Sequence, residues 1–138
     1  TKDGGRTALH LAALSCLAPV VRKLLANGAA PDVRDARGET ALHIGCGIGS
    51  HEVVHELVQG GAEFDGEGHA AHELTPLECC CVGKNGVLLE GHFAAAEVLL
   101  KAGARVGRAL QRLQDSKFEG PLSQQLEGRL NEAASSNP

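Results

Sequence analysis

The residues best suited to chemistry are three consecutive cysteines, Cys79, Cys80 and Cys81, which follow His69 and His72 in the chain. Thiolates and imidazoles are the ligands that Zn²⁺ prefers in structural sites of proteins. A cysteine beside a histidine can also act as a nucleophile. This segment therefore raises two chemical hypotheses, a zinc site and a reactive thiol.

The spacing of these residues is unfavourable for both hypotheses. Paired cysteines in zinc sites are usually separated by about two to four residues, and neighbouring side chains on a helix point about 100° apart. A reactive cysteine needs an electropositive setting, whereas Glu73 and Glu78 flank Cys79. The sequence also contains no phosphate-binding loop and no dinucleotide-binding turn. We therefore predict that the protein is not an enzyme and holds no metal or cofactor.

The cysteines as a set indicate a reducing compartment. There are five of them, an odd number, and Cys16 and Cys46 lie in segments that we predict to be helical. Such a set does not resemble a disulfide framework. We expect cysteine to serve here as a small apolar side chain, in a protein of the cytosol or nucleus.

The elements that carry these residues repeat along the chain. The stretch "GRTALHLAALSC" begins at Gly5 and "GETALHIGCGIG" begins at Gly38, so that Thr7 and Thr40 are 33 residues apart. A period of about 20 to 50 residues indicates a repeat architecture. Each unit reads as two short helices with apolar residues at helical spacing, followed by a loop rich in turn residues.

Three units fit this pattern, at about 3–35, 36–69 and 70–106. An insertion near 83–90 separates the two helices of the third unit, and insertions in repeat proteins fall in loops. Residues 107–134 predict two more helices with polar outer faces, as expected of a cap that ends a stack. The sequence therefore predicts one all-α domain over 1–138, a helix-turn-helix solenoid with a C-terminal helical cap.

The repeated phrase marks helix starts. Each unit opens its first helix with a threonine, at Thr7, Thr40 and Thr75. Threonine at the N-cap stabilises a helix by about 1 kcal/mol. Glu78 lies at the spacing of a capping box, and His10 and His43 occupy the equivalent position in the other units. We predict that these histidines reach back to the helix start, and that Pro19 and Ser50 begin the second helices.

The pattern "G-x-T-A-L-H-L-A-A" followed by "V-V-x-x-L-L-x-x-G-A" resembles the ankyrin repeat. The resemblance covers about 3–106 and is interrupted in the third unit. It implies antiparallel helix pairs stacked into a curved solenoid, with hairpin-like loops projecting at right angles. It also implies binding of another protein or peptide. Two residues depart from the family pattern, because Cys16 and Glu73 stand where glycine is expected.

The resemblance places partner contacts on the loop tips and on the exposed side of the first helix of each unit. By position, the candidates are Arg6, Leu14, Ser15, Arg37, Glu39, Ile48, His72, Leu74 and Val82. The apolar candidates would supply anchor area, unless their own neighbours cover them. The polar candidates would fix orientation and register. Val87, Leu88 and Leu89 of the insertion form a second candidate, since they either pack on neighbouring helices or face a partner.

Composition and charge narrow the class of partner. The net charge is −4, and only 2% of the residues are aromatic. The sequence shows no basic stripe with interleaved aromatic residues and no apolar run near the roughly 20 residues of a membrane span. We therefore expect a non-catalytic interaction module that holds a protein partner on its concave face and loop tips, with no nucleic acid, membrane or small-molecule substrate. The alternative is a structural spacer within a longer repeat array.

Overall fold

The computed structural model describes residues 6–64, 75–82, 90–115 and 120–136, which form helices and turns with no strand among them. The helices are α1 (Ala8–Leu14), α2 (Ala18–Ala26), α3 (Ala41–Ile48), α4 (His51–Gln59), α5 (Pro76–Val82), α6 (Glu90–Ala102), α7 (Gly107–Asp115) and α8 (Pro121–Ser136). The all-α prediction is confirmed. Most of the predicted insertion near 83–90 lies outside the described residues.

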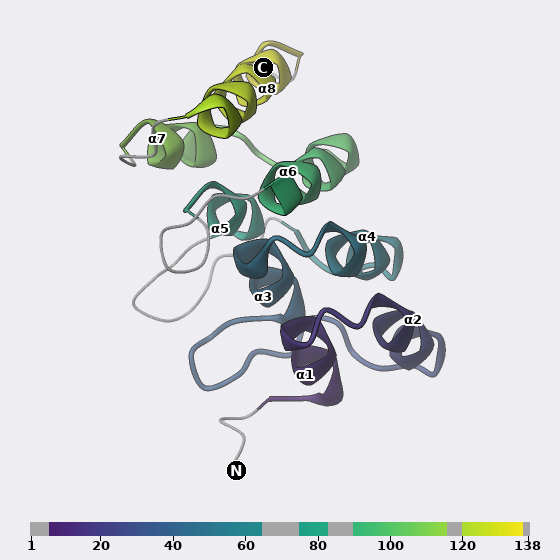
Figure 1. Ribbon diagram of the computed structural model, residues 1–138. Helices are drawn as coiled ribbons and strands as arrows, with labels where there is room; N and C mark the ends of the chain where they lie inside the picture. Colours follow the sequence, from purple (N-terminus) through teal and green to yellow (C-terminus); the bar gives the residue numbers. More distant parts are fainter. Residues whose placement is uncertain (1–5, 65–74, 83–89, 116–119, 137–138) are drawn as a thin grey trace.

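The helices pair, and the pairs stack (Figure 1). α1 packs on α2, α3 on α4, α5 on α6 and α7 on α8. Along the stack, α1, α3, α5 and α7 contact one another in turn and form a first row, while α2, α4, α6 and α8 form a second row. The connection from α2 to α3 extends beyond the first row (Figure 1). This is the predicted solenoid, with α7 and α8 in the place predicted for the cap; the boundaries of single units stay a prediction.

Small side chains let the two rows approach closely. Ala13, Cys46 and Cys81 each lie six residues after the threonine that starts α1, α3 or α5, and each is 0% exposed. A Cβ atom added to Gly45 would lie 3.2 Å from Cγ1 of Val53, so that α3 and α4 meet with little space between them. The prediction that the cysteines of α3 and α5 serve as small apolar side chains agrees with this burial.

The threonine and histidine phrase starts α1 and α3 as predicted. The backbone N–H of Thr7 donates to Nδ1 of His10 at 3.0 Å, and the N–H of Thr40 donates to Nδ1 of His43 at 3.3 Å. In return, the backbone N–H of each histidine donates to the threonine Oγ1. These are complete capping boxes, which satisfy backbone groups that a helix start leaves unpaired.

The other helix starts vary. In α5, the N–H of Glu78 donates to Oγ1 of Thr75 at 3.3 Å, and this Oγ1 donates to Oε1 of Glu78 at 3.2 Å, so a glutamate takes the place of the histidine. Pro19 lies in the first turn of α2, where its missing N–H costs nothing. Ser50 is the N-cap residue of α4 as predicted, although its side chain makes no capping hydrogen bond.

Cys16 ends α1 in a left-handed conformation, with φ at 57°. Its N–H donates to the carbonyl of Ala13 at 3.1 Å, and the N–H of Leu17 donates to that of Ala12 at 2.9 Å. This is a Schellman motif, in which glycine is the usual left-handed residue. The prediction that Cys16 lies inside a helix is wrong, because it follows α1 and is exposed. The equivalent position in the second unit is Gly49, with φ at 83°.

The α6 helix meets the end of α3 through two glycines. A Cβ atom on Gly91 would lie 2.0 Å from the backbone oxygen of Gly49, and a Cβ atom on Gly49 would lie 2.8 Å from Nδ1 of His92. Nε2 of His92 donates to the carbonyl of Gly47 at 2.8 Å, since a carbonyl oxygen only accepts. The start of α6 is thereby fixed against the turn between α3 and α4.

We predict that Cys16→Gly raises the free energy of unfolding by about 1 kcal/mol, because glycine adopts positive φ without the steric cost of a Cβ atom. Urea titration followed by circular dichroism measures the change. Cys16→Ser is the matched control, since it removes the thiol and keeps the Cβ atom. Equal stability of the glycine and serine variants would show that the conformation of Cys16 carries no strain.

We predict that Gly91→Ala lowers the free energy of unfolding by about 1–3 kcal/mol, because α6 must shift to admit the added methyl group. Gly47→Ala is the control on the neighbouring helix, since its added Cβ atom would meet nothing within 4 Å. Alanine there leaves stability unchanged or raises it by up to about 1 kcal/mol. Thermal unfolding of both variants compares them, and a harmless Gly91→Ala would contradict the close approach.

Candidate functional site

The first helix of one unit holds the loop that leads into the next. Nδ1 of His10 accepts the N–H of Thr7, so the ring proton is on Nε2. Nε2 donates to the carbonyl oxygen of Glu39 at 2.8 Å. The His10 side chain is buried. This one imidazole therefore joins the start of α1 to the base of the loop between α2 and α3.

Asp35 closes the tip of that loop. Its side chain accepts the backbone N–H groups of Arg37 at 2.9 Å and Glu39 at 3.0 Å, both through Oδ1. Its own N–H donates to the carbonyl of Glu39 at 2.9 Å, and the N–H of Gly38 donates to its carbonyl at 2.9 Å. Nε of Arg6 lies 3.7 Å from its Oδ2. The loop backbone is thus fixed by contacts within the chain, with no partner required.

The predicted loop candidates gather around this carboxylate. Arg37 and Glu39 bond to Asp35 through their backbones, and Arg6 forms an ion pair with it. Arg37 is exposed, whereas Arg6 and Glu39 are half-buried. The other two loop candidates, His72 and Leu74, lie outside the described residues.

The predicted helix candidates lie at the opposite ends of the same helices. Leu14 is the last residue of α1, Ser15 is its C-cap residue, and Ile48 is the last residue of α3. Ser15 is exposed, while Leu14 and Ile48 are half-buried and pack against the core. Leu14 and Ile48 therefore offer only part of their apolar surface to a partner. Val82 ends α5, and its side chain lies outside the described residues.

The first row therefore presents two groups of candidates. The loop group lies at the helix starts, and the helix group lies at the helix ends. A seven-residue helix such as α1 is about 10 Å long. A partner that touches both groups must span about that distance along the first row.

The cysteines of α5 are poor candidates for chemistry. Burial raises the pKa of the Cys79, Cys80 and Cys81 thiols above the ordinary value for cysteine. A raised pKa disfavours the thiolate, which is the form that attacks or binds a metal. Within the described residues, no group of three or more His, Cys, Asp and Glu side chains could hold a metal ion. His69 and His72 lie outside the described residues.

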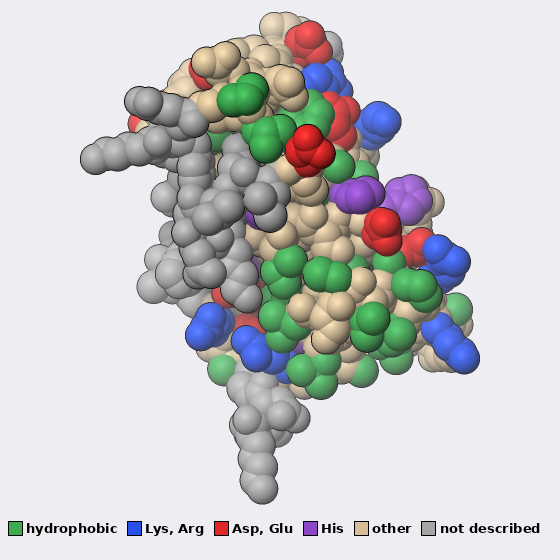
Figure 2. Space-filling view, in the orientation of Figure 1, with side chains coloured by type: hydrophobic (Ala, Val, Ile, Leu, Met, Phe, Trp, Pro, Cys, Tyr) green, Lys and Arg blue, Asp and Glu red, His purple; other side chains and the backbone are tan. Residues whose placement is uncertain are grey.

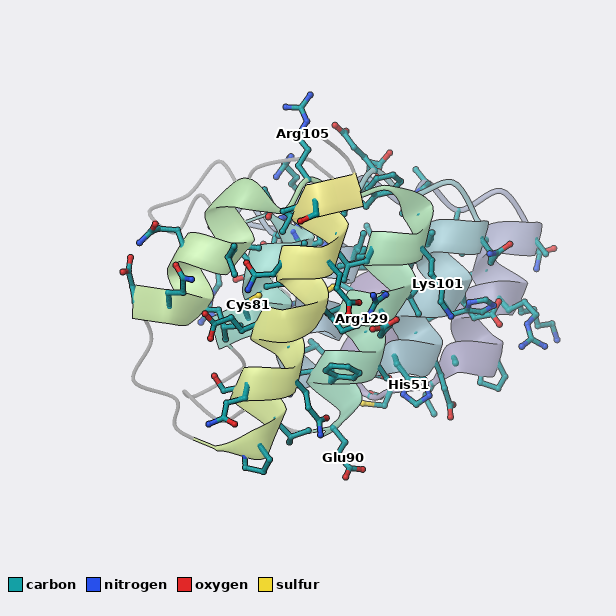
Figure 3. The ribbon with its side chains drawn as sticks, turned by 90° about the horizontal axis from the view of Figure 1, so that it is seen from above. His51, Cys81, Glu90, Lys101, Arg105 and Arg129 are labelled. Atoms are coloured by element: carbon teal, nitrogen blue, oxygen red, sulfur yellow. The ribbon has the colours of Figure 1, made fainter. Side chains whose placement is uncertain are left out.

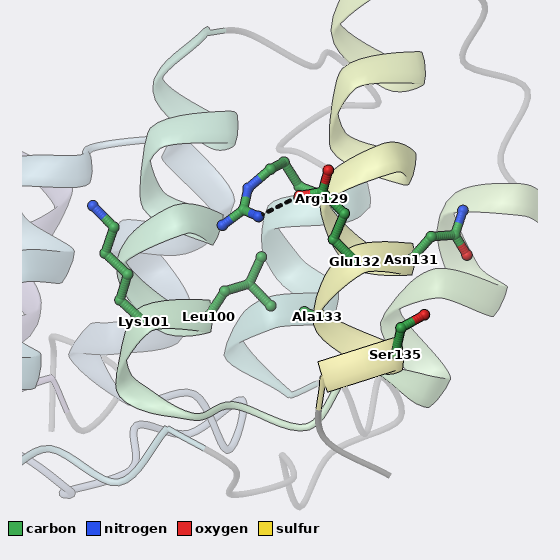
Figure 4. Close-up of a pocket in the computed structure, with 7 residues that line it drawn as sticks. All are labelled: Leu100, Lys101, Arg129, Asn131, Glu132, Ala133 and Ser135. Atoms are coloured by element: carbon green, nitrogen blue, oxygen red, sulfur yellow. Dashed lines mark hydrogen bonds and ion pairs between the residues drawn. The ribbon is translucent and has the colours of Figure 1, made fainter.

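A shallow groove lies between α6 and α8 (Figure 4). Its lining residues are Leu100, Lys101, Arg129, Asn131, Glu132, Ala133 and Ser135. Arg129 of α8, labelled in Figure 3, pairs with Glu97 of α6. It also pairs with Glu132 at 2.7 Å (Figure 4). Its charge is thus already compensated by two carboxylates. The ion pair of Arg129 with Glu97 joins the cap to the third unit.

Sequence reasoning missed the central role of Asp35. The sequence analysis counted it only among the unnamed turn residues of the loop between two units. A stronger signal was present in the segment "DARGET", where an acidic residue precedes a glycine and the helix-starting threonine. Its partner Arg6 lies 29 positions earlier in the chain, and only the stacking of units brings the two together.

Comparison with known proteins agrees with this architecture. Residues 9–109 match the family model described as ankyrin repeats (3 copies). The chain is 32% identical over 114 residues to human ankyrin repeat domain-containing protein 63, covering 80% of this chain and 28% of that protein. It is 38% identical over 109 residues to mouse ankyrin repeat and SOCS box protein 16, covering 73% and 22%.

A third relative is mouse NF-kappa-B inhibitor delta, which is 31% identical over 85 residues, covering 62% of this chain and 26% of that protein. The chain therefore spans less than a third of the length of each of these three relatives. In the described residues, no helix has both the length and the apolar character that crossing a membrane requires.

We predict that Asp35→Ala lowers the free energy of unfolding by about 1–3 kcal/mol, because two backbone N–H groups lose their acceptor. Asp115→Ala is the control, since Asp115 is exposed and accepts only a hydrogen bond from Gln111 within the described part of α7. Urea titration of both variants gives the difference. Equal losses for the two variants would contradict a special role of Asp35 in the loop.

Proposed function

The chain belongs to the ankyrin-repeat family, and from this membership we propose that it binds a protein partner through the first row and the loop tips, without catalysis. Repeats of this family generally bind other proteins. One observation carries the proposal for this chain: His10 and Asp35 hold the loop backbone in the free protein, while the side chain of Arg37 stays exposed.

A loop that is already ordered favours association. Ordering side chains and loops at an interface costs free energy. In a loop that is already fixed, most of this free energy was lost when the protein folded and not when it binds. Hydrogen bonds from the loop backbone to Asp35 supply this order. The protein thus acts as a scaffold that presents Arg37 in a defined place.

The two groups of candidates suggest what a partner offers. An acidic group would pair with Arg37 at the loop tip, and an apolar side chain would cover the exposed parts of Leu14 and Ile48. Ser15 lies beside the apolar pair and would form the polar rim. Arg6 and Glu39 would contribute by holding the loop in place, since both contact Asp35. His72, Leu74 and Val82 belong to the proposed surface by their place in the repeat.

Two further points support a binding role. The raised pKa of the buried thiols disfavours a thiol reaction. The name of one relative describes that protein as an inhibitor of NF-kappa-B, which agrees with the use of such repeats for protein contacts. We also place the protein in the cytosol or nucleus, since its described cysteines are free thiols.

A structural spacer within a longer array is the second candidate function. The match to three repeats, close to the smallest number that forms a stable stack, favours it. In a spacer, changes on the first row would leave every interaction of the protein intact. The following experiment separates the two functions.

We predict that Arg37→Glu and Ser15→Arg each weaken binding of proteins captured from cell lysate by about tenfold or more, or about 1.4 kcal/mol. The controls are Lys23→Glu and His55→Arg, which make the same charge changes at exposed positions of the second row. Circular dichroism first verifies equal helicity. Quantitative mass spectrometry then compares the captured proteins.

Loss of the same proteins with the second-row controls, but not with Arg37→Glu, would overturn the proposed surface. Identical capture by all four variants would favour a surface elsewhere on the chain. If the native chain captures no protein above background, the spacer function is favoured instead.

A further inference from the structure

The histidines of the described residues are of two kinds. His10, His43 and His92 are buried, and each ring is hydrogen-bonded within the stack. His51 and His55 of α4 are exposed, and neither ring has a hydrogen-bonding partner within the described part of the chain. The two exposed imidazoles therefore take no part in holding the described helices together.

The two exposed histidines are spaced to bind one ion. They begin and end the segment "HEVVH", one turn apart on α4. Side chains at this spacing share a face of the helix, with Cβ atoms about 5–6 Å apart. Two nitrogen ligands of a tetrahedral zinc ion are about 3.3 Å from each other, which imidazoles on such Cβ atoms can reach. Figure 2 shows two histidine side chains next to each other on the surface.

The repeat itself does not require histidine at these two positions. At the same places in the second helices of the neighbouring units stand Ala18 and Arg22, 33 residues earlier, and Phe93 and Glu97, 42 residues later. The capping histidines, in contrast, recur at the repeat period in the first two units. The histidine pair of α4 is therefore a feature of this one helix, and the need to stack does not account for it.

The surroundings of the pair favour a cation. Glu52 and Glu56 lie on the same helix, and Glu90 of α6 lines the same pocket as His51. Figure 3 labels His51 and Glu90 at the starts of α4 and α6. Arg22 pairs with Glu56 at 2.7 Å, while Glu52 and Glu90 form no ion pair with another described residue. Two carboxylates thus remain to attract a positive ion.

The pair would supply two of the ligands of an ion. No third side chain among the described residues is placed to complete a group of metal ligands. Peptidases with two histidines at this spacing hold zinc with a third protein ligand, and a catalytic glutamate activates the bound water. Both histidines here are exposed on the surface of the second row. The pattern therefore indicates ion binding alone.

We propose that His51 and His55 together bind a borderline divalent transition-metal ion, with water in the remaining positions. Imidazole is a preferred ligand of Zn²⁺, whereas a hard ion such as Mg²⁺ takes oxygen ligands. The site lies on the second row, and the partner surface proposed above uses no metal ion. The two proposals can therefore fail separately.

NMR of the histidine rings in the native chain tests the site with Zn²⁺ as the probe. The signals of the two rings are assigned from His51→Ala and His55→Ala, after circular dichroism shows equal helicity. We expect both rings to respond at the same Zn²⁺ concentration and neither to respond to Mg²⁺. We expect removal of one histidine to weaken Zn²⁺ binding at the other by about tenfold or more, because the two ligands no longer act on one ion.

A matched variant tests the spacing. His55→Gln with Gln59→His exchanges two exposed residues of α4 and keeps the composition. It separates the two imidazoles by two turns, or about 12 Å along the helix. We expect this variant to bind Zn²⁺ at His51 as weakly as His55→Ala does. Equal affinity of the exchanged and native chains would overturn the proposal, as would rings that respond at unequal Zn²⁺ concentrations, to Mg²⁺, or not at all.

Discussion

The hydrogen bond from His10 to the carbonyl of Glu39 is the contact on which the arrangement of the first two units depends. The same ring accepts the N–H of Thr7, so one side chain both starts α1 and positions the next unit. Isolated helices of seven to nine residues are unstable in water, since helix formation has a costly nucleus. Such helices persist only in a stack, and the histidine helps to set how one unit lies on the next.

Close packing turns this local contact into a rigid molecule. The core is made largely of small and branched side chains, and glycines bring α6 within backbone contact of the α3 end. A stack of this kind has little freedom to rearrange, because each helix contacts the next helix of its row and its partner in the other row. The loop that Asp35 closes is attached to this stack of helices. Order at the loop is therefore a consequence of order in the stack, which is what a pre-formed binding surface needs.

Local features could be predicted from the sequence, while features that join distant segments could not. The capping role of Thr7 and His10 follows from spacing within one turn of helix, and the structure confirms it. The ion pair of Arg6 with Asp35 required the stacking of two units. Cys16 was predicted to be helical because the residues around it favour a helix. Only its place in the family pattern, where glycine is usual, indicated the left-handed conformation.

The proposed binding surface requires that the loop between α2 and α3 is ordered in the free protein. Amide hydrogen exchange, measured by NMR on the chain alone, tests this order. The amides of Thr7, Arg37 and Glu39 donate to side chains of His10 and Asp35, and we expect them to exchange slowly, at rates near those of the amides inside α3. Exchange of these three amides at the rate of an unstructured chain, with α3 still protected, would contradict a loop that is fixed before binding.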